Sequence, residues 1–275
     1  MSNTGDKPQY LSPSRLADFQ ACPRRYQHVS VDRVRQPASY ASAKGSFVHA
    51  VFESLFHLPV GERTRDAAIS FLPEAATRVL TDVVKSEIGY DEVMAARLDT
   101  EARQMIERYF IMEDPNSVVS EGVELPLNVT IDGAPLYGIL DRLDRDENDD
   151  LVIVDYKTGA VPSRNFDSQT FANAEIYALM CQEATAPVLK RPVSIRLHYV
   201  AAGVTLERPV TPVVLRARRE AAVTAWQRIS LYYEKYLTGE AFPATPSKNA
   251  CRFCTYRRCV FHPNYDASTS TPSDQ

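Results

Sequence analysis

The amino-acid sequence predicts an α/β protein in which a central sheet is flanked by helices. Residues 10–115 mostly repeat apolar side chains at helical spacing, whereas residues 116–210 contain segments in which apolar and polar residues alternate. Two further helical patterns, over 168–184 and about 212–238, interrupt and follow these alternating segments. The 275 residues, 44% hydrophobic and 24% charged, are enough to enclose a sizeable apolar core.

Composition excludes several classes of protein. No apolar run approaches the roughly 18 residues that span a membrane, and the polar start MSNTGDKPQY is not a secretory signal. We therefore expect a cytoplasmic protein without a membrane partner. The formal net charge of −4 means that local basic patches must carry any binding to nucleic acid. Five cysteines in a reducing compartment favour metal ligation over disulfides.

Helix signals begin near the N-terminus. Ser12 followed by Pro13 predicts a helix start, and Pro23 predicts its end. Residues 46–58 carry one apolar stripe, and helical patterns recur over 64–86 and 91–112. Residues 32–45 are predicted to be a loop. The first nine residues and residues 266–275 are expected to be disordered.

The strands carry the candidate chemistry. Asp132-Gly133 is typical of a hairpin turn between the alternating segments GVELPLNVTI and APLYGILDRLDRD. In the next strand, LVIVDYK, Asp155 and Lys157 share parity and project to one face of the sheet. A short hairpin between these strands places Asp141 beside Asp155. Two carboxylates and an ammonium then converge at one sheet edge.

Charged groups at the end of an apolar strand are costly to bury without compensation. Carboxylate oxygens suit Mg²⁺ or Mn²⁺, which lower the pKa of bound water and hold phosphate. A nearby ammonium stabilises developing negative charge. The pattern therefore indicates metal-assisted phosphodiester hydrolysis. The alternative is a surface Asp–Lys pair at a strand end, and the D-x-K pattern alone favours that alternative.

Five blocks occur in one order along residues 10–262: LSPSRLADFQACPRRY, KGSFVHAVFE, YGILDRLD, VIVDYKTG and CRFCTYRRC. In these blocks the sequence resembles the RecB-like branch of the PD-(D/E)XK nuclease superfamily, which includes the iron–sulfur nucleases of CRISPR systems and AddB-type helicase–nucleases. Any one block is weakly to moderately specific, and all five in order are highly specific. The resemblance implies a restriction-endonuclease-like core, a mixed sheet flanked by helices.

The resemblance also implies an organisation along the chain. Residues 10–115 would form a helical region that carries Cys22 and His49, and residues 116–240 would form the nuclease core. Residues 241–265 would hold the C-terminal cysteine cluster.

Residue roles follow from the resemblance. The divalent cation would be bound by His49, Asp141, Asp155 and the carbonyl of Tyr156. Lys157 would position or activate the nucleophile. Glu124 fits the family's additional acidic position better than Glu121. Without the family context, a lone histidine on a core helix is usually structural. Glu53 and His57 follow His49 at four-residue steps on the same side of the helix. They would either contact the metal ligands or point into solvent.

Two departures from the family pattern stand out. The family usually has a Gln-x-x-x-Tyr helix after D-x-K, whereas NAEIY supplies Asn173 and Tyr177. The i,i+4 geometry is kept, but the shorter amide of Asn173 reaches less far. The C-terminal cysteines follow C-x2-C-x4-C, one residue shorter than the expected spacing.

The cysteines predict a second metal site. Cys251, Cys254 and Cys259 are closely spaced, and Cys22 is the natural fourth ligand. Spacing does not separate Zn²⁺ from a [4Fe–4S] cluster, and the resemblance favours the cluster. Either group would form a clasp between the N- and C-terminal segments. Cys181 lies at core spacing and is expected to be a buried apolar thiol.

Basic and aromatic residues surround these cysteines, a combination that suits single-stranded nucleic acid because cations meet phosphates while rings stack on bases. An exposed Arg-rich surface is the alternative. The predicted DNA-contacting residues here are Arg24, Arg25, Tyr26, Arg252, Tyr256, Arg257 and Arg258, with Asn173 added from the core.

The leading hypothesis is a metal-dependent DNA exonuclease that favours single strands or ends, in DNA repair, recombination or phage DNA processing. The second hypothesis is a non-catalytic module that holds DNA or a partner on the same fold. The third is a zinc-ribbon protein with an incidental acidic hairpin. The sequence contains no Walker A loop (G-x-x-x-x-G-K-[ST]), so ATP-driven unwinding would need a helicase or recombination partner.

Overall fold

The computed structural model describes residues 7–163, 167–184, 192–252, 254, 256–257 and 259–265. The chain divides into two compact units that interleave along the sequence, whereas the sequence predicts consecutive regions. The smaller unit comprises residues 1–36, 128–138 and 216–275, and the larger comprises residues 37–127 and 139–215. Of the ends expected to be disordered, residues 1–6 and 266–275 lie outside the described residues, while Pro8 is described and buried.

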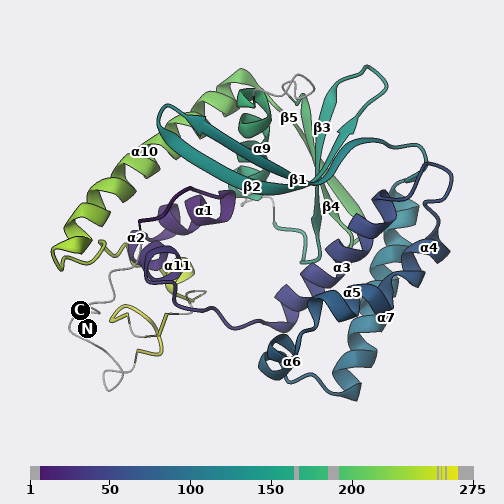
Figure 1. Ribbon diagram of the computed structural model, residues 1–275, viewed down its shortest axis with the longest axis horizontal. Helices are drawn as coiled ribbons and strands as arrows, with labels where there is room; N and C mark the ends of the chain where they lie inside the picture. The colour runs from purple at the N-terminus through teal and green to yellow at the C-terminus, as the bar shows by residue number, and fades with distance from the viewer. Residues whose placement is uncertain are drawn as a thin grey trace. The chain divides into compact units, whose positions relative to one another are not determined.

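A five-stranded mixed sheet organises the fold, in the order β1-β2-β3-β4-β5. The strands are β1 (Val119–Ile131), β2 (Ala134–Arg145), β3 (Leu151–Lys157), β4 (Ser194–Tyr199) and β5 (Val204–Pro209). Strand β3 runs antiparallel to β2 and parallel to β4, and β4 runs antiparallel to β5. This arrangement, with helices beside the sheet, confirms the predicted α/β fold class (Figure 1).

The larger unit holds most of the helices. They are α3 (Tyr40–Phe56), α4 (Arg65–Ser70), α5 (Leu72–Val79), α6 (Asp82–Ile88), α7 (Glu92–Met112), α8 (Asp167–Thr170) and α9 (Ala172–Glu183). Helix α3 begins at residue 40 rather than 46, so the predicted loop over 32–45 is too long. The reason is a capping box, in which Ser39 and Ser42 satisfy each other's backbone N–H groups.

Strand β3 is buried on both faces, which explains its continuous apolar run. One face, with Val152, Val154 and Tyr156, packs in a single apolar cluster with residues of α3 and α7. On the sheet side away from this cluster, α9 lies beside the strands in Figure 1 and packs against β3 and β4. The central strand is thereby fixed between two helical layers, and its C-terminal end carries Asp155 and Lys157.

The smaller unit contains α1 (Pro13–Ala21), α2 (Pro23–Tyr26), the π-helical turn η1 (Gln27–Val31), most of α10 (Pro212–Leu237) and α11 (Lys248–Arg252). The side chain of Ser12 caps α1 by accepting a hydrogen bond from the backbone N–H of Arg15, as the Ser-Pro pair predicts. In the hairpin between β1 and β2, Asp132 and Gly133 both have positive φ, 48° and 81°.

A charged network that the sequence analysis did not predict lies inside the larger unit. Arg142 is fully buried and donates hydrogen bonds to Asp144 at 2.8 Å and to Glu113 at 2.9 Å. It also donates to the hydroxyls of Tyr109 at 3.1 Å and Tyr156 at 2.6 Å. Because a buried guanidinium is tolerated only when it is paired, these partners fix β2 and β3 against α7.

Glu113 gives this network a pH dependence. Burial raises the pKa of Glu113, but the His198 ring, whose Nε2 atom lies 3.5 Å from Oε1 of Glu113, and the charge of Arg142 outweigh burial and lower the pKa to about 2. A depressed carboxylate pKa contributes stability that is fully present above the unfolded pKa, 4.5, and that is lost as the pH falls towards 2.

We expect Glu113→Gln to remove this contribution, about 3 kcal/mol at neutral pH. Urea unfolding measured between pH 7 and pH 2.5 should show a shallower loss of stability below pH 4.5 in the variant than in the wild type. Glu107→Gln, which changes a half-exposed carboxylate on α7, is the control and should follow the wild type. Parallel curves for Glu113→Gln and the wild type would contradict the assignment.

Candidate active site

The hairpin of β2 and β3 brings the two predicted aspartates to neighbouring positions. Arg142 pairs with Val154 in the strand register, so Asp141 and Asp155 come next on the two strands. The Oδ2 atom of Asp141 accepts a hydrogen bond from the backbone N–H of Tyr156 at 2.9 Å. Asp155 is buried and forms an ion pair with Lys157.

Helix α3 adds His49 to this group. Its Nδ1 atom lies 3.4 Å from Oδ2 of Asp141, and its Nε2 atom donates a hydrogen bond to the carbonyl of Tyr156 at 3.0 Å. The carbonyl predicted to ligate metal is therefore at the site. The histidine is positioned by the hydrophobic packing of α3, through Val48, Val51 and Phe52, on the face of β3 that carries Tyr156. Both ring nitrogens are thus fixed by groups of β2 and β3.

Strand β1 contributes Glu124 through an irregular backbone. Glu124 has a φ of +46°, and the regular alternation of buried and exposed residues in β1 holds only from Pro126 onward. A left-handed residue within a strand is typical of a β-bulge, which redirects a side chain. Glu121, the other candidate, lies elsewhere and pairs with Arg145 at 2.8 Å.

The side chains of His49, Glu124 and Asp141 each offer one ligand atom, and these three atoms all lie within 4.8 Å of one another. One imidazole nitrogen and two carboxylate oxygens suit Mn²⁺, and the carboxylates suit Mg²⁺. Asp155 is outside this group of three. The donor set fits a divalent cation that these three residues would hold, and ligation by Asp155 and by the Tyr156 carbonyl stays a prediction.

The aspartates differ in acidity. Burial raises the pKa of Asp141, but hydrogen bonding and the charge of His49 lower it overall. Burial raises the pKa of Asp155; the Lys157 ammonium opposes this rise and the charge of Asp141 adds to it. Neighbouring buried carboxylates cannot both ionise freely, so a cation between them would relieve a real repulsion.

Burial lowers the pKa of the two basic residues of the site, His49 and Lys157, and the neighbouring carboxylates raise it. Burial lowers the pKa of His49, but the hydrogen bond and charge of Asp141, with the charges of Asp155 and Glu124, raise it to about 9. Burial also lowers the pKa of Lys157, and the charge of Asp155 more than reverses this effect. Lys157 is therefore held as an ammonium at neutral pH.

Helix α9 places Tyr177 beside the acidic groups. Burial raises the pKa of its phenol, and the charges of Asp141 and Asp155 raise it further, so the hydroxyl stays protonated. Asn173, one turn earlier, is exposed. The structure thus places the tyrosine of the i,i+4 pair near the aspartates.

A cavity of about 490 Å³ opens over the metal-donor group. It is lined by Gly45, Ser46, His49, Ala50, Glu53, Arg78, Val79, Glu124 and Asp141. Arg78 of α5 is a residue that the sequence analysis missed, because nothing in the pattern LPEAATRV distinguishes it from a solvated helix residue. Glu53 turns inward to pair with Arg78, whereas His57 is exposed.

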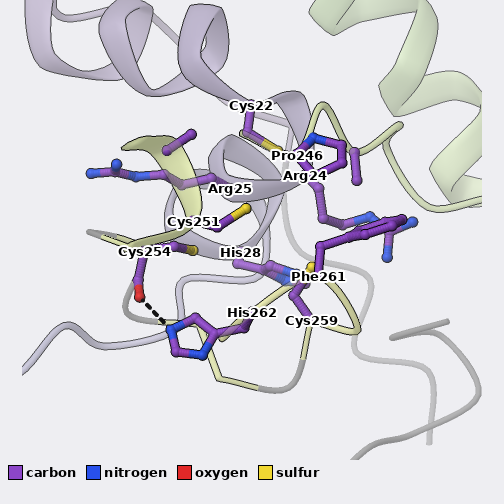
Figure 2. A pocket seen from close by; sticks show the side chains of 12 residues that line it. Cys22, Arg24, Arg25, His28, Pro246, Cys251, Cys254, Cys259, Phe261 and His262 are labelled. Carbon is purple, nitrogen blue, oxygen red and sulfur yellow. Dashed lines mark hydrogen bonds between the residues drawn. The ribbon is translucent and has the colours of Figure 1, made fainter. Parts of the chain in front are cut away.

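The four predicted cysteine ligands line one pocket of the smaller unit. Figure 2 shows Cys22, Cys251, Cys254 and Cys259 around it. The backbone N–H of Thr245 donates to the sulfur of Cys22 at 3.4 Å, and Nε2 of His262 donates to the carbonyl of Cys254 at 3.0 Å. Among the described residues, no three of these sulfur atoms meet the 4.8 Å spacing of the acidic group.

Cys181 is buried in the larger unit, as its core spacing predicts, and burial raises the pKa of its thiol to about 12.

The predicted DNA-contacting residues differ in their exposure and in their contacts with the rest of the protein. Arg24 and Arg25 line the cysteine pocket, where Arg24 donates to the carbonyl of Phe242 at 2.6 Å and Arg25 pairs with Asp18 at 2.9 Å. Arg252 and Arg257 are exposed, and Arg258 lies outside the described residues.

Two aromatic residues of that set require correction. Tyr26 is fully buried between Phe19 and Phe242, with ring centroids 5.6 and 6.3 Å away. Tyr256 is also buried and stacks on His28. Their rings already pack within the protein and are not available for bases. The sequence shows only that both residues lie next to arginines, and it does not show that the core of this unit buries their rings.

Comparison with known proteins agrees with the geometry. The family model of the PD-(D/E)XK nuclease superfamily matches residues 10–259. The matched region includes every residue of the metal-donor group, together with Asp155 and Lys157. No curated protein matches the chain. Among the described residues, no helix combines the length and apolar character that crossing a membrane requires.

We expect Mn²⁺ to stabilise the protein through the metal-donor group. A cation at a hundred times its Kd should add about 2.7 kcal/mol to the free energy of unfolding, and EDTA should reverse the gain. Asp141→Asn should abolish the rise in Tm measured by calorimetry. Asp99→Asn should retain it, since Asp99 is a half-exposed residue of α7 that pairs with Arg103 and is not part of the metal-donor group. An equal rise in both variants would place the cation elsewhere.

Proposed function

Because the chain belongs to the PD-(D/E)XK nuclease superfamily, we propose that it is a metal-dependent nuclease that hydrolyses DNA. The observation that carries this proposal is the convergence of His49, Glu124 and Asp141 within 4.8 Å, beside the ion pair of Asp155 and Lys157. A structural ion pair at a strand end would not need the third strand and the helix that complete this group.

The chemistry assigned to each residue follows from its charge. A divalent cation held by His49, Glu124 and Asp141 would bind phosphate and lower the pKa of water. Lys157 stays protonated, so its role is to donate hydrogen bonds to the attacking water or to a phosphate oxygen, rather than to remove a proton. Tyr177 also stays protonated and would act as a hydrogen-bond donor near the same carboxylates. Asp155 orients the ammonium of Lys157 through their ion pair.

We place the chain in the RecB-like branch and propose that it acts as an exonuclease on single strands or duplex ends, in repair, recombination or phage DNA processing. Support comes from the order of the five sequence blocks and from the gathering of four cysteines at one pocket. A helicase or recombination protein would supply any unwinding. Arg24, Arg25, Arg252 and Arg257 remain proposed contacts for the strand, and Asn173 remains a proposed contact from α9.

The cysteine pocket is proposed to hold a [4Fe–4S] cluster. Four sulfurs around one Zn²⁺, at about 2.3 Å from the metal, would lie only about 3.8 Å apart. The choice of the cluster over Zn²⁺ comes from the resemblance in sequence, and the metal content of the protein distinguishes the two. The hydrogen bond from Thr245 to the Cys22 sulfur is of the kind that supports a ligating thiolate.

We expect the chain to degrade end-labelled linear DNA in Mg²⁺ or Mn²⁺ and to leave circular single strands intact. Asp155→Asn and Lys157→Ala should each lower the initial rate about a hundredfold to a thousandfold, because each removes a charged group at the reacting phosphate. Asp99→Asn is the matched control and should be as active as the wild type. DNA binding without cleavage by the wild type in either metal would instead support a non-catalytic module.

For the cysteine pocket, we expect protein purified without oxygen to contain about four irons and little zinc. Cys22→Ala and Cys254→Ala should lose the metal and the visible absorption of the cluster, and should melt at lower temperature, because a bound metal contributes folding free energy. Cys181→Ala should keep the metal, since that thiol lies in the core of the larger unit. One zinc per chain would identify the alternative metal, and unchanged melting would refute the clasp.

A further inference from the structure

We propose that Arg78 binds a phosphate group of the DNA strand beside the metal-donor group, and that Glu53 positions its guanidinium. This inference rests on the proposed nuclease function and adds a substrate-binding residue to it. Arg78 lies outside the residues that the motifs identify, and its assignment depends on the cavity that it shares with His49, Glu124 and Asp141.

Two helices direct Arg78 into this cavity. Glu53 lies on α3 one turn after His49, so both side chains emerge on the same side of the helix. Arg78 lies in the last turn of α5, and its Nη2 atom donates a hydrogen bond to Oε2 of Glu53. The pair is therefore anchored to the same helix that supplies the candidate metal ligand.

The charge of the cavity calls for a further cation. Its lining holds the carboxylates of Glu53, Glu124 and Asp141, which repel a polyanionic strand. Among the described lining residues, Arg78 is the only lysine or arginine, and it lines the same cavity as the three carboxylates. Lys157 does not line this cavity and is engaged with Asp155.

The guanidinium has the donors that phosphate recognition requires. It carries five N–H groups in a planar fork, and its hydrogen bond to Glu53 uses Nη2 alone. The side chain of Arg78 is 48% exposed, so a ligand in the cavity can reach the remaining donors. An ion pair this exposed is weak, so Glu53 can orient the fork without preventing it from binding phosphate.

The test measures binding separately from cleavage. Fluorescence anisotropy of a labelled single-stranded oligonucleotide, with Ca²⁺ in place of Mg²⁺, gives the Kd from 50 to 300 mM salt, and a gel verifies that the DNA stays intact. Arg78→Gln should weaken binding about tenfold at 50 mM salt and reduce the slope of log K against log salt by about 0.7, the loss of one phosphate contact. Arg78→Lys should restore the slope and only part of the affinity, because it keeps the charge but not the fork.

Arg103→Gln is the matched control, because Arg103 also lies in a helical ion pair and its side chain is 46% exposed. It should keep the affinity and salt slope of the wild type. A lower Tm in Arg78→Gln with an unchanged slope would mean that Arg78 only braces α5 against α3, and would overturn the inference. Cleavage by the wild type with normal binding by Arg78→Gln would overturn this inference alone. Absence of both binding and cleavage in the wild type would overturn the proposed function with it.

Discussion

Two carboxylates at neighbouring positions of adjacent strands repel each other unless positive charge lies near them. The register of β2 and β3 imposes this juxtaposition on Asp141 and Asp155. The chain meets part of the requirement with His49, with Lys157 and with the backbone N–H of Tyr156. The pKa of Asp141 is lowered and that of Asp155 is raised, so these groups compensate the two carboxylates unequally.

Tyr156 links this site to the buried network on the other face of the sheet. Its N–H and carbonyl contact Asp141 and His49, while its hydroxyl accepts a hydrogen bond from Arg142. Successive residues of a strand point to opposite faces of the sheet. Asp141 therefore belongs to the candidate site, and its neighbour Arg142 belongs to the buried network. Arg142, held by Glu113 and Asp144, keeps this section of β2 in register with β3. The positions of the acidic groups therefore depend on a charge network that does not itself touch substrate.

Local patterns were sufficient to predict the strands, the Asp132-Gly133 turn and the convergence of Asp141 with Asp155, because strand periodicity and turn chemistry act over a few residues. They did not predict the partners of Arg142, since Glu113 lies 29 residues away in sequence. The burial of Tyr26 and Tyr256 and the capture of Arg78 by Glu53 also depend on tertiary packing. The early start of α3 depends on a Ser–Ser capping box, which is less distinctive in sequence than a Ser–Glu box.

The acidic group and the cysteine pocket belong to different units, so each proposal can stand or fall alone. The acidic group gives the stronger argument for chemistry. Burying Asp155 beside Asp141 costs stability, and apolar residues at these positions would avoid that cost. The fold nevertheless keeps both aspartates. It also brings in Glu124 through a left-handed residue in β1, and a cavity of about 490 Å³ opens beside Glu124 and Asp141. These features are expected of a site that binds a ligand. These features favour a ligand-binding role for this part of the sheet over a purely architectural one.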